Sequence, residues 1–269
     1  MEPVRAGVDL SPATRNLAGE SVVRVEGAPV GWVLSVCPAA GEAGGSFRIA
    51  AREPKPRHDG PTADPERAAS EAARRARGKL RRYCRAHGLN RLGTLTYRGE
   101  GCHDPIQLRG HVRVFFKALR ALLGGVAFPY VWTAEWHKSG HGLHVHFAVG
   151  QFVKRSLIER AWGHGFVHIK LLGDLPVGSG QWEEARKAAG YLSKYVGKAF
   201  IDEGRIPGLH RYEVAQGFQP EVVQVYGRTA DAAITDACRL FSGREPARRW
   251  SSADVVGWEG PPAVWVQWA

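Results

Sequence analysis

Two histidines separated by a single residue lie in the apolar run LHVHFAVG, residues 143–150. In a β-strand the side chains of residues i and i+2 point to the same face, so His144 and His146 project side by side. The preceding run PYVWTAEW, residues 129–136, also has the composition of a strand, and the Ser-Gly pair between the two runs is typical of a turn. The sequence therefore predicts a β-hairpin over residues 129–149 that carries two imidazoles on one face.

Two neutral imidazoles on one strand face provide half of a divalent metal site, although histidine pairs also occur in well-packed cores. The turn of the hairpin brings Glu135 across from His144 and His146. Whether its carboxylate faces the same side depends on strand register, which the sequence does not fix. A carboxylate and two imidazoles with open positions suit magnesium or manganese better than a closed zinc site. His137 and His141 are reserve ligands, and we expect both to be exposed to solvent near the turn.

A second group of reactive side chains lies in GYLSKYVGK, residues 190–198. On a helix Tyr191 and Tyr195 are four residues apart and emerge on one face, with Lys194 and Lys198 on or beside it. A phenol is a poor nucleophile at neutral pH. A nearby ammonium group and a metal-polarised phosphate would each favour attack by the phenolate. The alternative is that one tyrosine packs in the core and the other lies on the surface.

Helical and strand patterns alternate along the rest of the chain. Helical patterns cover residues 65–87, 110–125, 154–162, 180–200 and 229–241, and strand patterns cover residues 21–27, 31–38, 91–99, 129–136, 143–150, 165–172 and 263–269. This alternation, with at least one hairpin, predicts an α+β fold whose antiparallel central sheet has flanking helices. We expect a weakly ordered N-terminal extension over residues 1–64 that contains a strand pair joined at Ala28-Pro29, a core domain over 65–201, and a C-terminal appendage of unknown role over 202–269.

The chain is strongly basic, with a formal net charge of +11 and a pI near 9.8. An excess of this size favours an anionic partner, most commonly nucleic acid, although a soluble basic protein without such a partner is the alternative. Much of the excess lies in the helix predicted over residues 65–87. Its basic residues include Arg74, Arg75, Arg77, Lys79, Arg81, Arg82 and Arg85. These positions wrap much of the helix surface, so we expect a phosphate-contacting element rather than an ordinary amphipathic helix.

Several classes of protein are disfavoured by the sequence. The N-terminus lacks the apolar centre of a signal peptide and no stretch approaches the length of a membrane span, so we expect a cytoplasmic protein without membrane contact. The 4 cysteines are dispersed, without metal-site spacing, and we expect reduced thiols. The glycines of residues 190–198 are too far apart for a phosphate-binding loop, which predicts no ATPase activity. Any DNA unwinding would then need a separate host helicase.

Taken in order, three short motifs resemble those of the HUH endonucleases, specifically the rolling-circle replication initiators of plasmids and phages. The stretch GTLTYR, residues 93–98, looks like the first motif of that family, and HVHF, residues 144–147, matches its His-hydrophobic-His motif. The stretch YLSKY, residues 191–195, matches both its Tyr-x-x-Lys motif and the spacing of its two-tyrosine branch. Glu135 lies upstream, where the family often places a third ligand. The resemblance spans roughly residues 90–200.

The resemblance implies an enzyme that nicks one strand of origin DNA, which is single-stranded or exposed in a hairpin. A divalent metal polarises the scissile phosphate, a tyrosine attacks it, and a 5′-phosphotyrosine link and a free 3′-hydroxyl result. A second tyrosine can then release and close the displaced strand. By this resemblance Tyr191 and Tyr195 are the nucleophiles, and Lys194 stabilises the phosphate or the nucleophile. Thr96 and Tyr97 would be structural or adjacent to DNA.

Three other interpretations remain open from the sequence. An HUH transposase or a relaxase would use the same chemistry in another biological role. A metal-dependent hydrolase would use His144 and His146 without a covalent tyrosine, with His164 and His168 as further ligands. A non-catalytic DNA-binding protein would account for the charge but not for the tyrosine spacing.

Overall fold

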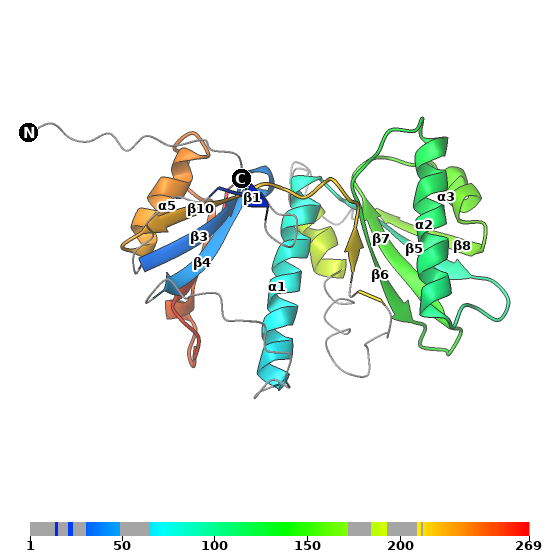
Figure 1. Ribbon diagram of the computed structural model, residues 1–269, viewed down its shortest axis with the longest axis horizontal. Coiled ribbons are helices and arrows are strands. Elements are labelled where there is room, and N and C mark those ends of the chain that lie inside the picture. The colour runs from blue at the N-terminus through cyan, green and yellow to red at the C-terminus, as the bar shows by residue number, and fades with distance from the viewer. Residues whose placement is uncertain are drawn as a thin grey trace, which may run out of the picture. The chain divides into compact units, whose positions relative to one another are not determined.

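The computed structural model describes residues 14–15, 21–23, 31–48, 65–171, 184–192, 209–210 and 212–268. The described chain is an α+β protein, as predicted, and it contains two separate sheets where one central sheet was expected (Figure 1). It divides into a central unit, residues 59–218, and a terminal unit made of residues 1–58 and 219–269. The two units are described in turn.

The central unit is built on a five-stranded sheet in the order β8-β5-β7-β6-β9. Its strands are β5 (Arg91–Tyr97), β6 (Tyr130–Trp136), β7 (Leu143–Val149), β8 (Gly165–Leu171) and β9 (Glu213–Val214). All neighbours pair antiparallel, and β6 and β7 form the predicted hairpin. The edge strand β9 comes from the part of the chain beyond residue 201, so the sheet continues past the expected end of the core domain.

Helices cover both faces of the central sheet. They are α1 (Pro65–Ala86), α2 (Pro105–Leu122), α3 (Arg155–Trp162) and the helical residues 184–192. α2 and α3 pack on one face of the sheet and cover an apolar core. Figure 1 shows this face on the side of the sheet away from α1. A second apolar cluster joins α1 and residues 184–192 to the opposite face. This second face carries His144 and His146.

Two helices differ from their predicted form. α2 begins five residues earlier than expected because Asp104 caps it, accepting a 2.8 Å hydrogen bond from the backbone N–H of Ile106, and Pro105 occupies the first turn. α1 does have an apolar stripe, contrary to the expectation. Leu80, Tyr83 and Cys84 are buried against the sheet and Arg85 is buried too, so the other arginines and the lysine wrap only the remaining surface.

A glycine allows β5 and β7 to pack closely. Gly93 is the register partner of Phe147, and a β-carbon on Gly93 would lie 2.2 Å from the Phe147 ring. The ring therefore takes the space of the missing side chain and extends into the core under α2, where it packs edge-on against Phe115. The glycine in GTLTYR thus has a packing role in this fold.

The terminal unit combines the two ends of the chain in a seven-stranded sheet, in the order β1-β2-β10-β3-β4-β12-β11. Its elements are β1 (Thr14–Arg15), β2 (Ser21–Val23), β3 (Gly31–Cys37), β4 (Glu42–Arg48), β10 (Val222–Gly227), α5 (Ala230–Arg239), β11 (Arg248–Ser251), β12 (Ala263–Gln267) and the short 3-10 helices Pro38–Ala40 and Ser252–Asp254. α5 packs on β3 and β10 over one apolar cluster. All pairs are antiparallel except β2 with β10.

Three details of this unit were not foreseen. The predicted pair of strands, now β2 and β3, are not neighbours, because β10 lies between them. β4 was missed because its Gly44-Gly45 pair gives it the composition of a loop. A β-carbon at Gly45 would lie 1.8 Å from the carbonyl oxygen of Val33, so the close pairing with β3 requires glycine. Within residues 1–64, where weak order was expected, Gly31–Arg48 form two strands and their connection.

Two sequence predictions concern the whole chain. All four cysteines are buried and none is paired in a disulfide; the expectation of reduced thiols remains a prediction. Among the helices of the described residues, none combines the length and the apolar character that crossing a membrane requires.

Candidate metal centre

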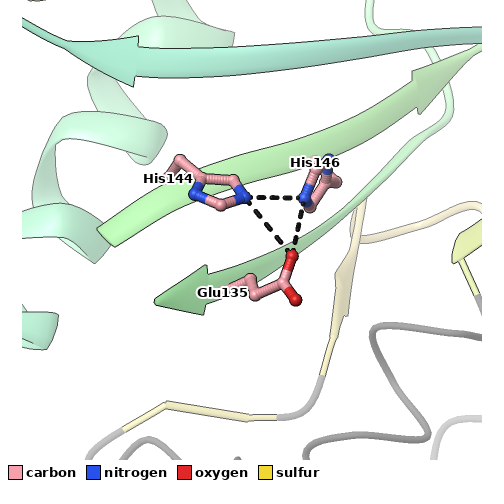
Figure 2. A group of neighbouring side chains, drawn as sticks. All are labelled: Glu135, His144 and His146. Carbon is pink, nitrogen blue, oxygen red and sulfur yellow. Dashed lines mark hydrogen bonds and ion pairs between the residues drawn. The ribbon is translucent and has the colours of Figure 1, made fainter. Parts of the chain in front are cut away.

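The register of the β6–β7 hairpin decides where Glu135 points. Glu135 is the direct partner of His144, and Thr133 is the direct partner of His146. Direct partners share a face, so the carboxylate lies on the histidine side of the sheet. Figure 2 shows the three side chains of Glu135, His144 and His146 converging, with the carboxylate beneath the two rings. The candidate ligand set of the sequence is thus brought together in the fold.

The donor atoms form a compact triangle. The two Nε2 atoms of His144 and His146 are 2.9 Å apart. Glu135 Oε2 lies 3.2 Å from His146 Nε2 and 3.4 Å from His144 Nε2. For bonds of about 2.0–2.2 Å, neighbouring ligands lie about 3.0 Å apart at a right angle and about 3.4 Å apart at the tetrahedral angle. The triangle therefore fits one face of a metal's coordination shell.

A threonine on the neighbouring strand orients one of these ligands. Thr94 of β5 pairs directly with His146, and its Oγ1 lies 3.1 Å from His146 Nδ1. When Nδ1–H donates to Thr94, the lone pair of Nε2 is directed at the triangle, which is the tautomer that a metal ligand needs. The sequence predicts no role for Thr94. This residue lies in the strand predicted over residues 91–99, but only the register of β5 against β7 joins it to His146.

Burial holds the two imidazoles in place. His144 is 9% exposed and His146 is 6% exposed, while Glu135 is partly exposed on the same face. All residues of β7 are buried, so the rings are held on a strand that is covered on both faces. Such support keeps donor atoms in position without a bound ion, which is what a preorganised ligand set requires.

Tyr191 lies beside this triangle. Its ring centroid is 6.4 Å from that of His146, and the ring planes are nearly perpendicular at 81°. Tyr191 packs at the edge of the apolar cluster that includes the buried Leu192. At the start of the same helical segment, Glu184 accepts a 2.5 Å hydrogen bond from the Asn90 side chain, which ties it to the sheet just before β5. Tyr195, Lys194 and Lys198 lie outside the described residues.

The other histidines considered as ligands lie apart from the triangle. The ring of His137 is 5.4 Å from that of His144, and its Nδ1 accepts a hydrogen bond from the backbone N–H of Ser139 at 3.2 Å. His141 donates through Nε2 to the carbonyl oxygen of Tyr97 at 3.0 Å. His168 pairs with Thr94 and shares the histidine face, but it is exposed and two strands away from β7.

The opposite face of the sheet holds His164. Its ring stacks on that of His111 with centroids 3.9 Å apart, and both rings approach Tyr97. Burial, the charge of His111 and the charge of Arg98 together lower the pKa of His164 below its usual value. Burial likewise raises the pKa of Tyr97 far above the usual range, so its phenol stays protonated. Among the described residues, therefore, neither His164 nor His168 extends the donor set.

Most of the basic residues of α1 lie on its surface, whereas Arg85 is buried. Arg74, Arg75 and Lys79 are exposed, whereas Arg81 and Arg82 are partly buried. Arg75 forms an exposed ion pair with Glu71 one turn away, at 3.6 Å. Such pairs are weak and are readily exchanged for other anions. The predicted DNA contacts of this helix remain a prediction.

Comparison with known families identifies the same part of the chain. Residues 90–200 match a family model described as replication-associated protein, of the ORF2 type. The match includes β5, the complete β6–β7 hairpin with Glu135, His144 and His146, and the segment that carries Tyr191. It supports a replication-associated protein. Searches of curated proteins and of solved structures found no significant match.

Proposed function

We propose that this chain is a replication initiator that nicks and rejoins single-stranded origin DNA through a 5′-phosphotyrosine intermediate and thereby starts rolling-circle replication. The observation that carries the proposal is the position of Tyr191, whose ring lies 6.4 Å from His146 on the face where three donor atoms converge. The match of residues 90–200 to the replication-associated protein family supports the same function.

The side chains divide the chemistry between them. Glu135, His144 and His146 would hold magnesium or manganese, which when bound draws electron density from the scissile phosphate and favours attack. The Tyr191 oxygen forms the new bond to phosphorus while the bond from phosphorus to the 3′ oxygen breaks. The released oxygen takes up a proton and becomes the 3′-hydroxyl that primes synthesis. Rejoining is the reverse displacement, in which a 3′-hydroxyl attacks the phosphotyrosine.

The two-tyrosine form of this mechanism adds a second nucleophile. Tyr195 is proposed to accept the second strand transfer, and Lys194 to stabilise phosphate or phenolate charge. Lys198 and the basic residues of α1 are proposed to contact DNA phosphates. These assignments rest on the motif YLSKY and on the charge of the chain.

The histidine face also carries an exposed aromatic side chain. On β8, Phe166 pairs with Thr96 and His168 pairs with Thr94. The side chains of Phe166 and His168 therefore lie on the same face of the sheet as His146. Phe166 is 69% exposed, which is unusual for a large apolar side chain in a sheet. An exposed aromatic ring provides a stacking surface for an unpaired base. Single-stranded DNA that crosses β8 would reach the triangle on β7.

Covalent trapping tests the proposal. Single-stranded DNA of random central sequence is labelled at its 3′ end, incubated with protein and manganese, and denatured. A 5′-phosphotyrosine link predicts that the 3′ label migrates with the protein, while a 5′ label is released on a shorter fragment. Cleavage without any adduct would indicate a hydrolase and would contradict the proposal, as would a 5′ label attached to protein.

Tyrosine variants test the roles of the two nucleophiles. We expect Tyr191→Phe with Tyr195→Phe to lose the adduct, and at least one of the single variants to retain cleavage. Tyr226→Phe, in the terminal unit, is a matched control that should form the adduct at the normal rate. An undiminished adduct in the double variant would show that the tyrosine assignment is wrong.

A further inference from the structure

A groove of about 660 Å³ lies in the central unit, between α2 and the edge of the sheet formed by β6 and β9. Because α2 packs on the face opposite to the histidines, this groove is separate from the metal triangle. Its volume is within the range of ligand pockets in proteins, about 300–1,000 Å³. No sequence motif pointed to it.

One wall of the groove is cationic. Arg109, Arg113, Lys117 and Arg120 all line it, and their spacing of four, four and three residues places them along one side of α2. Arg109 forms an ion pair with Glu213 across the groove at 2.9 Å, and Arg120 donates to the carbonyl oxygen of Gly125 at 2.6 Å. Arg113 and Lys117 are exposed, and within the described part of the chain they make no ion pair. Two of these four cations are thus available to an incoming anion.

The remaining walls are largely aromatic. Tyr130 stacks on Phe116 with ring centroids 3.6 Å apart and a 6° interplanar angle, and Phe128 and Phe218 also line the groove. Tyr130 and Phe218 are only partly buried, so their rings contribute to the accessible surface. Gln216 and the Glu213 carboxylate add polar groups that can pair with the edge of a base.

We propose that this groove binds a short stretch of single-stranded DNA, with phosphates along the Arg113 and Lys117 side and bases against the aromatic walls. A row of cations beside aromatic rings is the combination by which proteins hold unpaired strands. The inference rests on the proposed function for the identity of the nucleic acid. It adds a contact that is independent of the metal and of Tyr191. Because two contacts on one strand act together, the groove would raise the affinity for DNA longer than the nicked segment.

Binding without cleavage separates this inference from the proposed function. Fluorescence anisotropy of a labelled oligomer of about 30 nucleotides in EDTA measures affinity across a range of salt concentrations. For Arg113→Gln with Lys117→Gln, we expect a loss of affinity of about tenfold. The slope of log binding constant against log salt concentration should become shallower by about 1.4, because each single-strand phosphate contact contributes about 0.7 to it. The matched control is Lys154→Gln, at the residue before α3, with Arg160→Gln on α3. It removes the same charge at exposed sites and should bind like the unaltered protein.

A second variant tests the groove itself rather than its charge. Ala127 lines the groove and is exposed, so Ala127→Trp fills it without changing the net charge. We expect weaker binding of this variant with an unchanged salt dependence. In the unaltered protein, 5-iodouracil in the oligomer should photo-crosslink to Tyr130 or Phe218, which line the groove. Equal losses in the α2 and α3 variants, or equal effects on single-stranded and duplex DNA, would overturn the inference. Failure of covalent trapping with these binding results intact would instead refute only the nicking chemistry.

Discussion

All seven side chains of β7 are buried, yet the two faces of this strand are stabilised by different interactions. On one face Val145 and Phe147 pack into the apolar core under α2 and α3. On the other face His144 and His146 meet Glu135 and Thr94 through polar contacts of 2.9–3.4 Å. The strand therefore combines a face whose burial stabilises the fold with a face whose polar groups are positioned for chemistry.

The difference implies that stability and activity can be separated by single substitutions on one strand. Apolar burial is the main favourable contribution to folding, whereas buried polar groups contribute little net stability even when they are hydrogen-bonded. We expect changes on the core face to unfold the protein and changes on the polar face to leave a folded but inactive one. Four experiments examine this contrast, from the largest expected effect to the smallest.

The largest effect is expected from removing both imidazoles. His144→Ala with His146→Ala should lower the rate of adduct formation by about a thousandfold or more, because a bound metal contributes several kcal/mol to the transition state. Urea unfolding in EDTA should show a change of about 1 kcal/mol or less in the free energy of unfolding. His168→Ala, on the same face but exposed, should retain activity. A metal-dependent adduct in the double variant would contradict the assignment of the ligands.

Phe147→Ala addresses the opposite face of the same strand. The free energy of unfolding should fall by about 3–5 kcal/mol, because the cavity left by the ring beside Gly93 cannot close on a rigid pair of strands. Urea denaturation followed by tryptophan fluorescence measures this change. Phe166→Ala, which truncates an exposed ring, should alter stability by about 0.5 kcal/mol or less. If both substitutions had the same cost, the face under α2 would not be the structural core.

A smaller effect is expected at the partner of His146. Thr94→Val keeps the shape of the side chain and removes its oxygen, so His146 loses the group that fixes its tautomer. We expect manganese affinity, measured by calorimetry, to fall about 10- to 100-fold, and Thr94→Ser to restore most of it. Thr96→Val, two residues further along β5, is the control and should bind manganese normally. Normal affinity in Thr94→Val would show that the 3.1 Å contact has no part in the site.

The smallest effect concerns pH on the core face. Burial and the charges of His111 and Arg98 lower the pKa of His164, so the folded protein takes up a proton there less readily than the unfolded chain. Stability from this residue is therefore full above its unfolded pKa and is lost as the pH falls below about 6.5.

Urea unfolding at about pH 7.5 and about pH 5.0, on either side of the ordinary histidine pKa, measures this loss. His164→Asn should reduce the difference between the two pH values, and His168→Asn, which is exposed, should not. An unchanged pH dependence in His164→Asn would mean that the His164 ring does not contribute to it.

Much of this molecule follows from local sequence patterns. The hairpin of β6 and β7 and the strand that contains Thr94 were predicted with ends close to those observed, and residues 184–192 around Tyr191 are helical as predicted. Side-chain periodicity fixes these elements because it depends only on neighbours along the chain. The same periodicity placed His144 and His146 on one face before any tertiary contact was known.

The long-range pairings depended on the tertiary structure. The sequence did not determine on which face of the sheet the Glu135 side chain lies, because a shift of one residue in strand register would turn it away from His144. The contact of Thr94 with His146, the position of Tyr191 beside that ring and the groove along α2 each join segments far apart in the chain. The terminal sheet is a further case, since β10 separates β2 from β3. Local patterns thus determined which residues could form the site, and the packing of distant segments decided which of them meet, because register and packing are set by the whole fold.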